Sequence, residues 1–118
     1  MTKHHVIVFS RAVVRAAQLL ELSQSELADI LGISAATPSR IADDRRVLKS
    51  GSKPWQLAVL FIRMFRSLGA MVASDDVAAR VWLRGPNVAL AGVPLKLIRG
   101  PGGLVRTINY LDAVRTNH

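Results

Sequence analysis

The hydrophobic pattern of the chain is helical from position 10 onward, because apolar residues recur every three or four positions. Ser10 can cap a first helix, and a capping box from Ser23 to Glu26 opens a second, in which each side chain would bond the other residue's backbone amide. Ser34 can cap a third helix that runs toward position 43 or 44. No segment after position 9 alternates with the period of a strand. The pattern therefore predicts an all-α fold.

Proline and glycine divide the rest of the chain into further predicted helices. A basic, polar stretch over 45–53 is typical of a flexible linker. The helices expected after it cover 55–68, 75–84, a short segment near 94–98, and 104–114. Gly69 is expected to end the first of these, and the glycine-rich run over 100–103 to act as a hinge before the last. The helix over 55–68 is apolar on nearly every side, which predicts that it is central to the fold or covered by another chain.

Small and apolar residues between Gln24 and Asp43 follow the spacing of a helix-turn-helix. Ala28 is small where the two helices would cross, Gly32 makes the turn four residues later, and Ile41 anchors the second helix. An ordinary helical hairpin is the alternative. In a helix-turn-helix the start of the second helix reaches base edges, and nearby arginines contact phosphates. The candidate DNA-binding residues are therefore Ser34, Ala35, Ala36, Thr37, Ser39, Arg40, Arg45 and Arg46.

Pro38 lies inside the third expected helix. If Ser34 caps that helix, Pro38 has no amide that could donate back to the Ser34 carbonyl. Its fixed backbone angle would instead start the helix one turn later. Arg40 is the only long hydrogen-bond donor among the candidates on this helix. The residues alone therefore leave sequence-specific DNA binding open.

The composition is that of one small folded domain with an anionic partner. The chain has 118 residues, of which half are apolar and a fifth charged, so it does not have the composition of a disordered protein. Its net charge of +8 is uneven: residues 1–50 carry 7 basic and 5 acidic side chains, and residues 51–118 carry 9 and 3. Arginine supplies 12 of the 16 positive charges and suits phosphates and carboxylates. The partner is thus nucleic acid or an acidic protein surface.

The sequence offers no set of residues for catalysis or for binding a metal or cofactor. Cysteine is absent, which excludes disulfides and zinc–thiolate sites. The three histidines lie near the chain ends without metal-ligand spacing. Asp75 and Asp76 are adjacent on a helix, so their side chains point in different directions. We expect their negative charges to stabilise the N-terminus of that helix. The longest uncharged stretch, 85–95, is too short to cross a membrane. We therefore expect a non-enzymatic cytoplasmic protein without a cofactor.

A run of short motifs follows in order toward the C-terminus. It reads Trp82-Leu83, Pro86-Asn87, Leu90 and Gly92, then Pro94 to Ile98, Gly100 and a final amphipathic helix. In this order, behind the helix-turn-helix, residues 23–115 resemble the Xre/ParS/MbcA family of antitoxins. The chain departs from the family pattern at Ala91, where a first glycine is usual, and in a gap from Gly92 to Pro94 that is one residue shorter than expected.

The resemblance implies an Xre-like helix-turn-helix region packed on a C-terminal helical toxin-binding region. The C-terminal region would bind a RES-domain toxin, an enzyme that consumes NAD by phosphorolysis, hydrolysis or ADP-ribosyl transfer, and would block the cleft where NAD enters. The N-terminal region would dimerise or bind the promoter of its own operon. We expect a flexible N-terminal segment over 1–9, the helix-turn-helix region over 10–50 and the toxin-binding region over 51–118.

The chemistry of the C-terminal residues agrees with that implication. A basic half would complement an acidic toxin face, and arginine and tyrosine are frequent in binding hot spots. The candidate toxin-binding residues are Trp82, Asn87, Arg99, Arg106, Tyr110 and Arg115. For each arginine taken singly, a solvated helix face is the alternative. The expected partners are a RES-domain toxin, promoter DNA and a second copy in a homodimer or toxin–antitoxin hetero-oligomer. A free-standing dimeric helix-turn-helix regulator is the alternative function.

Overall fold

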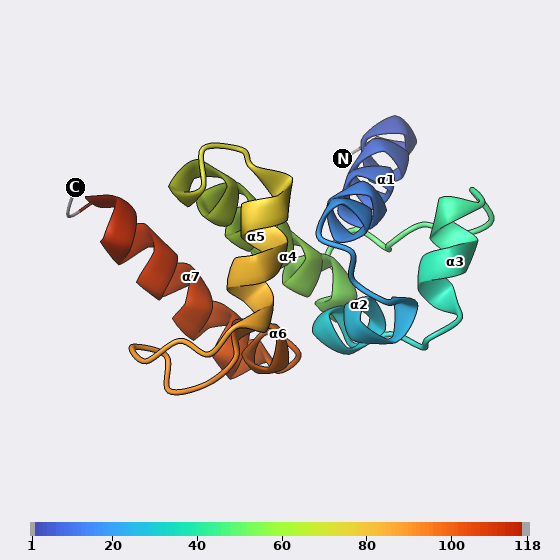
Figure 1. Ribbon diagram of the computed structural model, residues 1–118. Helices are drawn as coiled ribbons and strands as arrows, with labels where there is room; N and C mark the ends of the chain where they lie inside the picture. Colours follow the sequence, from blue (N-terminus) through green and yellow to red (C-terminus); the bar gives the residue numbers. More distant parts are fainter. Residues whose placement is uncertain (1, 117–118) are drawn as a thin grey trace. The chain divides into compact units, whose positions relative to one another are not determined.

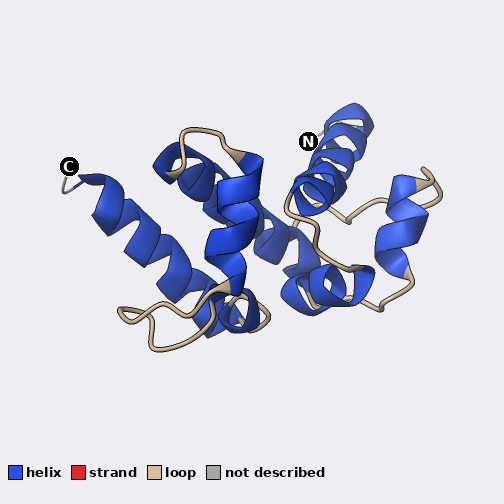
Figure 2. Ribbon diagram, viewed as in Figure 1, coloured by secondary structure: helices blue, strands red, loops and turns tan. Residues whose placement is uncertain are grey.

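A computed structural model describes residues 2–116, which form seven helices (Figure 1). They are α1 (Lys3–Leu19), α2 (Gln24–Leu31), α3 (Thr37–Ala42), α4 (Lys53–Met71), α5 (Asp76–Arg84), α6 (Pro94–Leu97) and α7 (Pro101–Thr116). Loops join the helices and no strand occurs in this part of the chain (Figure 2). The all-α prediction is confirmed.

The chain divides into two compact units, Met1–Val59 and Leu60–His118. The division falls inside α4, which contributes its first turns to one unit and its remainder to the other. The sequence predicts a boundary at residues 50 and 51, in the polar stretch over 45–53. Part of that stretch is fixed in the first unit, because Leu48 is only 3% exposed and its amide donates to the Ser10 hydroxyl at 2.9 Å.

The first helix begins at Lys3, seven residues before its expected start at Ser10. The side chain of Thr2 caps it by accepting a hydrogen bond from the amide of His5 at 3.3 Å. The ring of Phe9 packs on Trp55 with centroids 4.4 Å apart. This corrects the expectation of a flexible segment over residues 1–9, because a cap and an aromatic contact hold the described part of that segment in a helix. Position 1 lies outside the described residues.

Ser10 is not the N-cap of the first helix, as the sequence predicts, but has another structural role. It lies inside α1, and its hydroxyl donates to the Val6 carbonyl at 2.7 Å while accepting from the Leu48 amide. The side chain is 1% exposed, so these bonds satisfy a hydroxyl that would otherwise be buried without a partner.

Helices α2 and α3 form the predicted helix-turn-helix. The capping box is present, with Ser23 Oγ accepting from the Glu26 amide at 3.0 Å and Glu26 Oε1 accepting from the Ser23 amide at 2.8 Å. Gly32 ends α2 in the left-handed conformation, with φ +70°. Ala28 and Ile41 are both buried. The small residue, the turn and the anchor therefore occupy the positions that the motif requires.

The third helix begins at Thr37, so Ser34 is not its N-cap. The Ser34 hydroxyl is instead hydrogen-bonded to the Thr37 hydroxyl at 2.9 Å. Pro38 lies in the first turn, where the missing amide costs no helical hydrogen bond. The helix thus starts later than a Ser34 cap would give, but the N-cap moves by two residues, to Ala36, and not by the full turn expected.

Three glycines of the second unit, Gly69, Gly102 and Gly103, lie within helices. Helix α4 continues past Gly69 to Met71, and the chain then turns through Ala73 and Ser74, both with positive φ. Helix α7 starts at Pro101, so Gly102 and Gly103 belong to its first turn and do not form the expected hinge. A Cβ on Gly103 would lie 2.0 Å from the Leu97 carbonyl oxygen, whereas nothing lies within 4 Å of one on Gly102. Glycine at 103 therefore allows α6 and α7 to approach closely.

Among residues 2–116 no single helix is long and apolar enough to cross a membrane. Helices α4 and α5 meet that test only when taken together, with a bend of 112° between them.

Candidate functional site

The candidate DNA-binding residues lie on the turn before α3, on α3 itself and just after it. Ser34, Ala35, Ala36 and Arg40 are exposed. Thr37 is 6% exposed and its hydroxyl is bonded to Ser34, so it supports the start of the helix and is not free to contact a base. The exposed side chains here are small, and Arg40 supplies the long donor that the sequence pointed to.

Arg46 lies in a surface groove of about 350 Å³ beside the turn. The groove is lined by Ile33, Ser34, Thr37, Arg46, Val47, Leu48, Lys49, Ser52 and Pro54. Two cationic side chains and two serines thus border one hollow in the first unit. Its positive border matches the phosphate contacts expected of Arg46.

Two carboxylates close to α3 are already paired with arginines. Arg45 Nη2 lies 3.0 Å from Asp43 Oδ2, and Arg11 Nε lies 2.8 Å from Asp44 Oδ1. The hydrogen bond from Arg11 holds the pKa of Asp44 below its ordinary value. All four side chains are more than half exposed, so each pair contributes little to stability.

Four of the six candidate toxin-binding residues gather around α5, α7 and the loop between α5 and α6. The rings of Trp82 and Tyr110 are stacked, with centroids 6.3 Å apart and planes inclined by 17°. Arg106 lies one turn before Tyr110 on α7, and its Nη2 donates to the Leu90 carbonyl at 2.9 Å. Trp82 and Tyr110 are partly exposed and Arg106 is exposed, so both rings and the guanidinium are open to a partner.

Asn87 organises the loop over 85–92. Its backbone forms an antiparallel bridge with Gly92, with N···O distances of 2.8 and 3.2 Å. Its side-chain oxygen accepts from the Leu90 amide at 2.9 Å. Ala91 adopts φ +55°, a left-handed conformation that favours glycine, and this explains why glycine is usual at this position in the family pattern. The bonding role expected of Asn87 is thus present.

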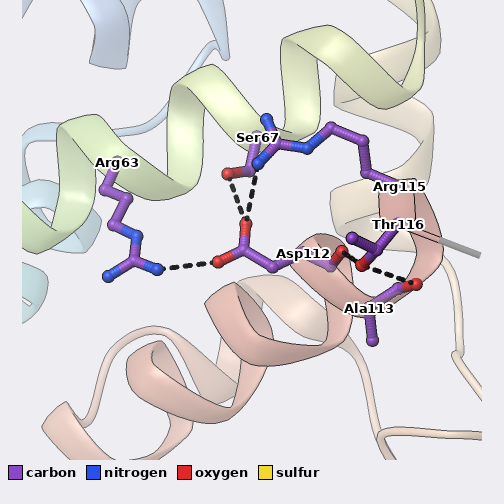
Figure 3. A network of polar contacts seen from close by, with 6 residues as sticks. All are labelled: Arg63, Ser67, Asp112, Ala113, Arg115 and Thr116. Atoms are coloured by element: carbon purple, nitrogen blue, oxygen red, sulfur yellow. Dashed lines mark hydrogen bonds and ion pairs between the residues drawn. The ribbon is translucent and has the colours of Figure 1, made fainter.

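Arg115 lies apart from that group, in a network around Asp112 (Figure 3). The Asp112 carboxylate accepts from Ser67 Oγ at 2.9 Å and from Arg63 Nη2 at 2.8 Å, both on α4, while Arg115 Nη2 lies 3.7 Å away. Nine residues separate Arg106 from Arg115, which is about half a turn out of phase on an α-helix. Arg115 therefore belongs to the α4 side of α7.

The Asp112 network is the part of this unit that sequence reasoning missed. The hydrogen bond from Ser67 lowers the pKa of Asp112 most, and Arg63 and Arg115 lower it further, while burial opposes them. A signal was present, because Asp112 is the only carboxylate residue after position 76. A lone acidic residue in a basic segment is a natural partner for arginines.

The segment that contains Trp82 and Tyr110 is strongly basic in sequence. Residues 77–111 contain no aspartate or glutamate and five basic residues, Arg80, Arg84, Lys96, Arg99 and Arg106. Arg99 is exposed at the turn between α6 and α7. This stretch of +5 is suited to an acidic protein surface.

The two units define a class of protein in which a helix-turn-helix is joined to a helical unit with a basic, partly aromatic binding surface. Comparison with family models agrees with both parts. Residues 9–63 match the antitoxin Xre-like helix-turn-helix domain, and residues 67–116 match the antitoxin Xre/MbcA/ParS C-terminal toxin-binding domain. No curated protein matches the chain significantly. The chain belongs to the Xre/MbcA/ParS family of antitoxins.

Proposed function

We propose that this antitoxin neutralises a RES-domain toxin by binding it and covering the cleft through which NAD enters. The proposal is supported by the stacked pair of Trp82 and Tyr110, which lies within the basic, acid-free stretch over 77–111. Tyrosine, tryptophan and arginine are the residues most enriched in binding hot spots. The chain acts by occlusion in the cytoplasm and contributes no catalysis and no cofactor of its own.

The candidate toxin-binding residues would contribute to the complex in different ways. Trp82 and Tyr110 supply apolar contact area, and the exposed Arg99 supplies charge toward an acidic toxin face. Asn87 shapes the loop through its bonds to Leu90 and Gly92. Arg115 lies apart from this surface, on the α4 side of α7, and the nearby Asp112 carboxylate partly neutralises the charge that it could offer to the toxin.

Co-expression of this chain with a RES-domain toxin tests the proposal. We expect the two to co-purify and the cellular NAD concentration to stay normal, whereas the toxin alone depletes NAD. Arg99→Glu should weaken the complex at least tenfold. Arg66→Glu, which makes the same charge change at an exposed position on α4 outside 77–111, is the matched control. Failure to co-purify, with NAD still depleted, would refute the proposal.

A second activity, promoter binding with autoregulation of the operon, is supported by the exposed Arg40 on α3 and by the groove that Arg46 borders. We expect Arg40→Ala to weaken binding to the operon promoter and to make that binding less sensitive to salt. The plot of log K against log salt has a negative slope, and each lost phosphate contact reduces its magnitude by about 0.9. Arg15→Ala, at an exposed position on α1, is the control. An unchanged slope would remove α3 from the DNA interface.

We also propose that the chain self-associates, as a homodimer or within a toxin–antitoxin hetero-oligomer. Most apolar side chains of α4 are buried within the chain, and Val59, at 47% exposed, is the large apolar residue of this helix that is open to a second chain. Light scattering coupled to size exclusion should give a mass above that of one chain at micromolar concentration. A monomer at that concentration would contradict self-association.

A further inference from the structure

The loop over 85–92 is exposed and yet carries no charged residue. Its exposed side chains are apolar and belong to Pro86, Val88, Ala89 and Ala91. Val88 is 98% exposed, more than the other large apolar residues that the described structure leaves open. Surface loops are usually polar, and exposed apolar clusters mark interaction sites. The loop between α5 and α6 stands out from the ribbon in Figure 1.

The same loop is held in one conformation without a partner. The two Asn87–Gly92 hydrogen bonds close it, and the Ala91 amide donates to the Val88 carbonyl at 3.1 Å. Leu90, in the middle of the loop, is 3% exposed and fixes it to the second unit. Binding through a preformed loop loses little conformational entropy, so its apolar contacts contribute more fully to affinity.

Arg106 braces this loop from α7. Its guanidinium donates to the Leu90 carbonyl at 2.9 Å, and Leu90 lies two residues after Val88. A change at Arg106 therefore acts on the position of Val88 as well as on surface charge. Arg106 is thus a positioning residue for the loop.

Charge decides what covers the loop. The segment over 77–111, which contains the loop, carries five basic and no acidic side chains, and Arg106 of this segment is bonded to the loop, so two copies that met through the loop would bring like charges together. An acidic protein with an apolar hollow is complementary to it. We propose that the loop over 85–92 is a preformed docking element whose Val88 fills an apolar pocket on the acidic face of the toxin. This inference rests on the proposed function and names the element of the surface that anchors the complex.

Binding of full-length variants to the purified RES-domain protein, measured by calorimetry, tests the anchor. Val88→Asp should raise the Kd at least about 30-fold, the lower limit for a hot-spot residue. Because Val88 is almost fully exposed, the variant should melt at the wild-type temperature. Val8→Asp makes the same change at an exposed position of α1 and should stay within threefold of wild type.

If the wild-type chain binds the toxin and Val88→Asp weakens that binding less than tenfold, Val88 is not the anchor of the complex. The proposed function would still stand in that case. An equal loss in Val8→Asp would overturn the anchor too, since the effect would not be local. If the wild-type chain does not bind, the proposed function itself fails and the anchor with it.

A double-mutant cycle separates bracing from direct contact. Arg106→Met should weaken binding in the wild-type background and add little to Val88→Ala, because both changes act through the same loop. Amide exchange over 88–91 should be faster in Arg106→Met. Additive effects with unchanged exchange would show that Arg106 contacts the toxin itself and would overturn its positioning role.

Discussion

Among the glycines, Gly103 is the one at which an added Cβ would come closest to neighbouring atoms. A Cβ there would lie 2.0 Å from the Leu97 carbonyl oxygen, 2.6 Å from its carbon and 3.1 Å from its Cα. All three are backbone atoms, so no side-chain rotation relieves the clash. Real Cβ contacts do not fall below 3.0 Å, so α6 and α7 would have to separate by at least about 1 Å.

That separation would pull Leu104, Ile108 and Leu111 away from the core, where each is at most 2% exposed. Overpacking of this kind costs about 1–3 kcal/mol, and more where backbone must move. Against it stands a gain of about 1 kcal/mol in helix propensity from replacing glycine by alanine. Because backbone atoms are involved, we take the upper part of the overpacking range and expect Gly103→Ala to lower the free energy of unfolding by about 1–2 kcal/mol.

Gly102→Ala is the matched control, because it lies in the same turn of α7 with nothing within 4 Å of the added methyl. It should keep the propensity gain and raise stability by about 0.5–1 kcal/mol. Urea unfolding followed by far-ultraviolet circular dichroism measures both variants. Gly103→Ala at or above wild-type stability would refute the close approach of α6 and α7.

Two further predictions concern the second unit. Asp112→Asn should lower the free energy of unfolding at pH 7 by about 1 kcal/mol. The pKa of Asp112 is depressed in the folded chain, so the stabilisation by its carboxylate is complete above the ordinary aspartate range. It disappears as the pH falls through the folded pKa. Melting curves from pH 7 to pH 2 should therefore converge for the two proteins, and a constant gap would contradict the ion network. Ala91→Gly should raise stability by about 0.5 kcal/mol in thermal melts, because glycine adopts a positive φ without strain. Ala89→Gly, in the same loop, should lower stability. Equal effects of the two substitutions would contradict the left-handed conformation of Ala91.

The parts of the fold that could be predicted are those set by local chemistry. The capping box at Ser23 and the turn at Gly32 lie where the pattern put them, because both depend on residues within one turn. The organising role of Asn87 was visible for the same reason. The family resemblance rested on such local motifs, which is why the comparison with family models confirmed it.

The parts that could not be predicted depend on contacts between distant residues. The packing of Phe9 on Trp55 supports α1 ahead of Ser10, and nothing near Phe9 in sequence announces it. Position 103 lies inside a helix and yet requires glycine, because Leu97 of another helix leaves no room for a Cβ. The link between Arg115 and Asp112 likewise depends on Ser67 and Arg63 of α4 holding that carboxylate.

The sharpest test of the proposed occlusion is a crystal structure of this chain bound to the proposed RES-domain toxin. The account predicts that residues 77–111 are buried against the toxin, with Val88 in an apolar pocket and the NAD cleft closed by the Trp82–Tyr110 surface. A complex in which that cleft is open and residues 77–111 face solvent would contradict it.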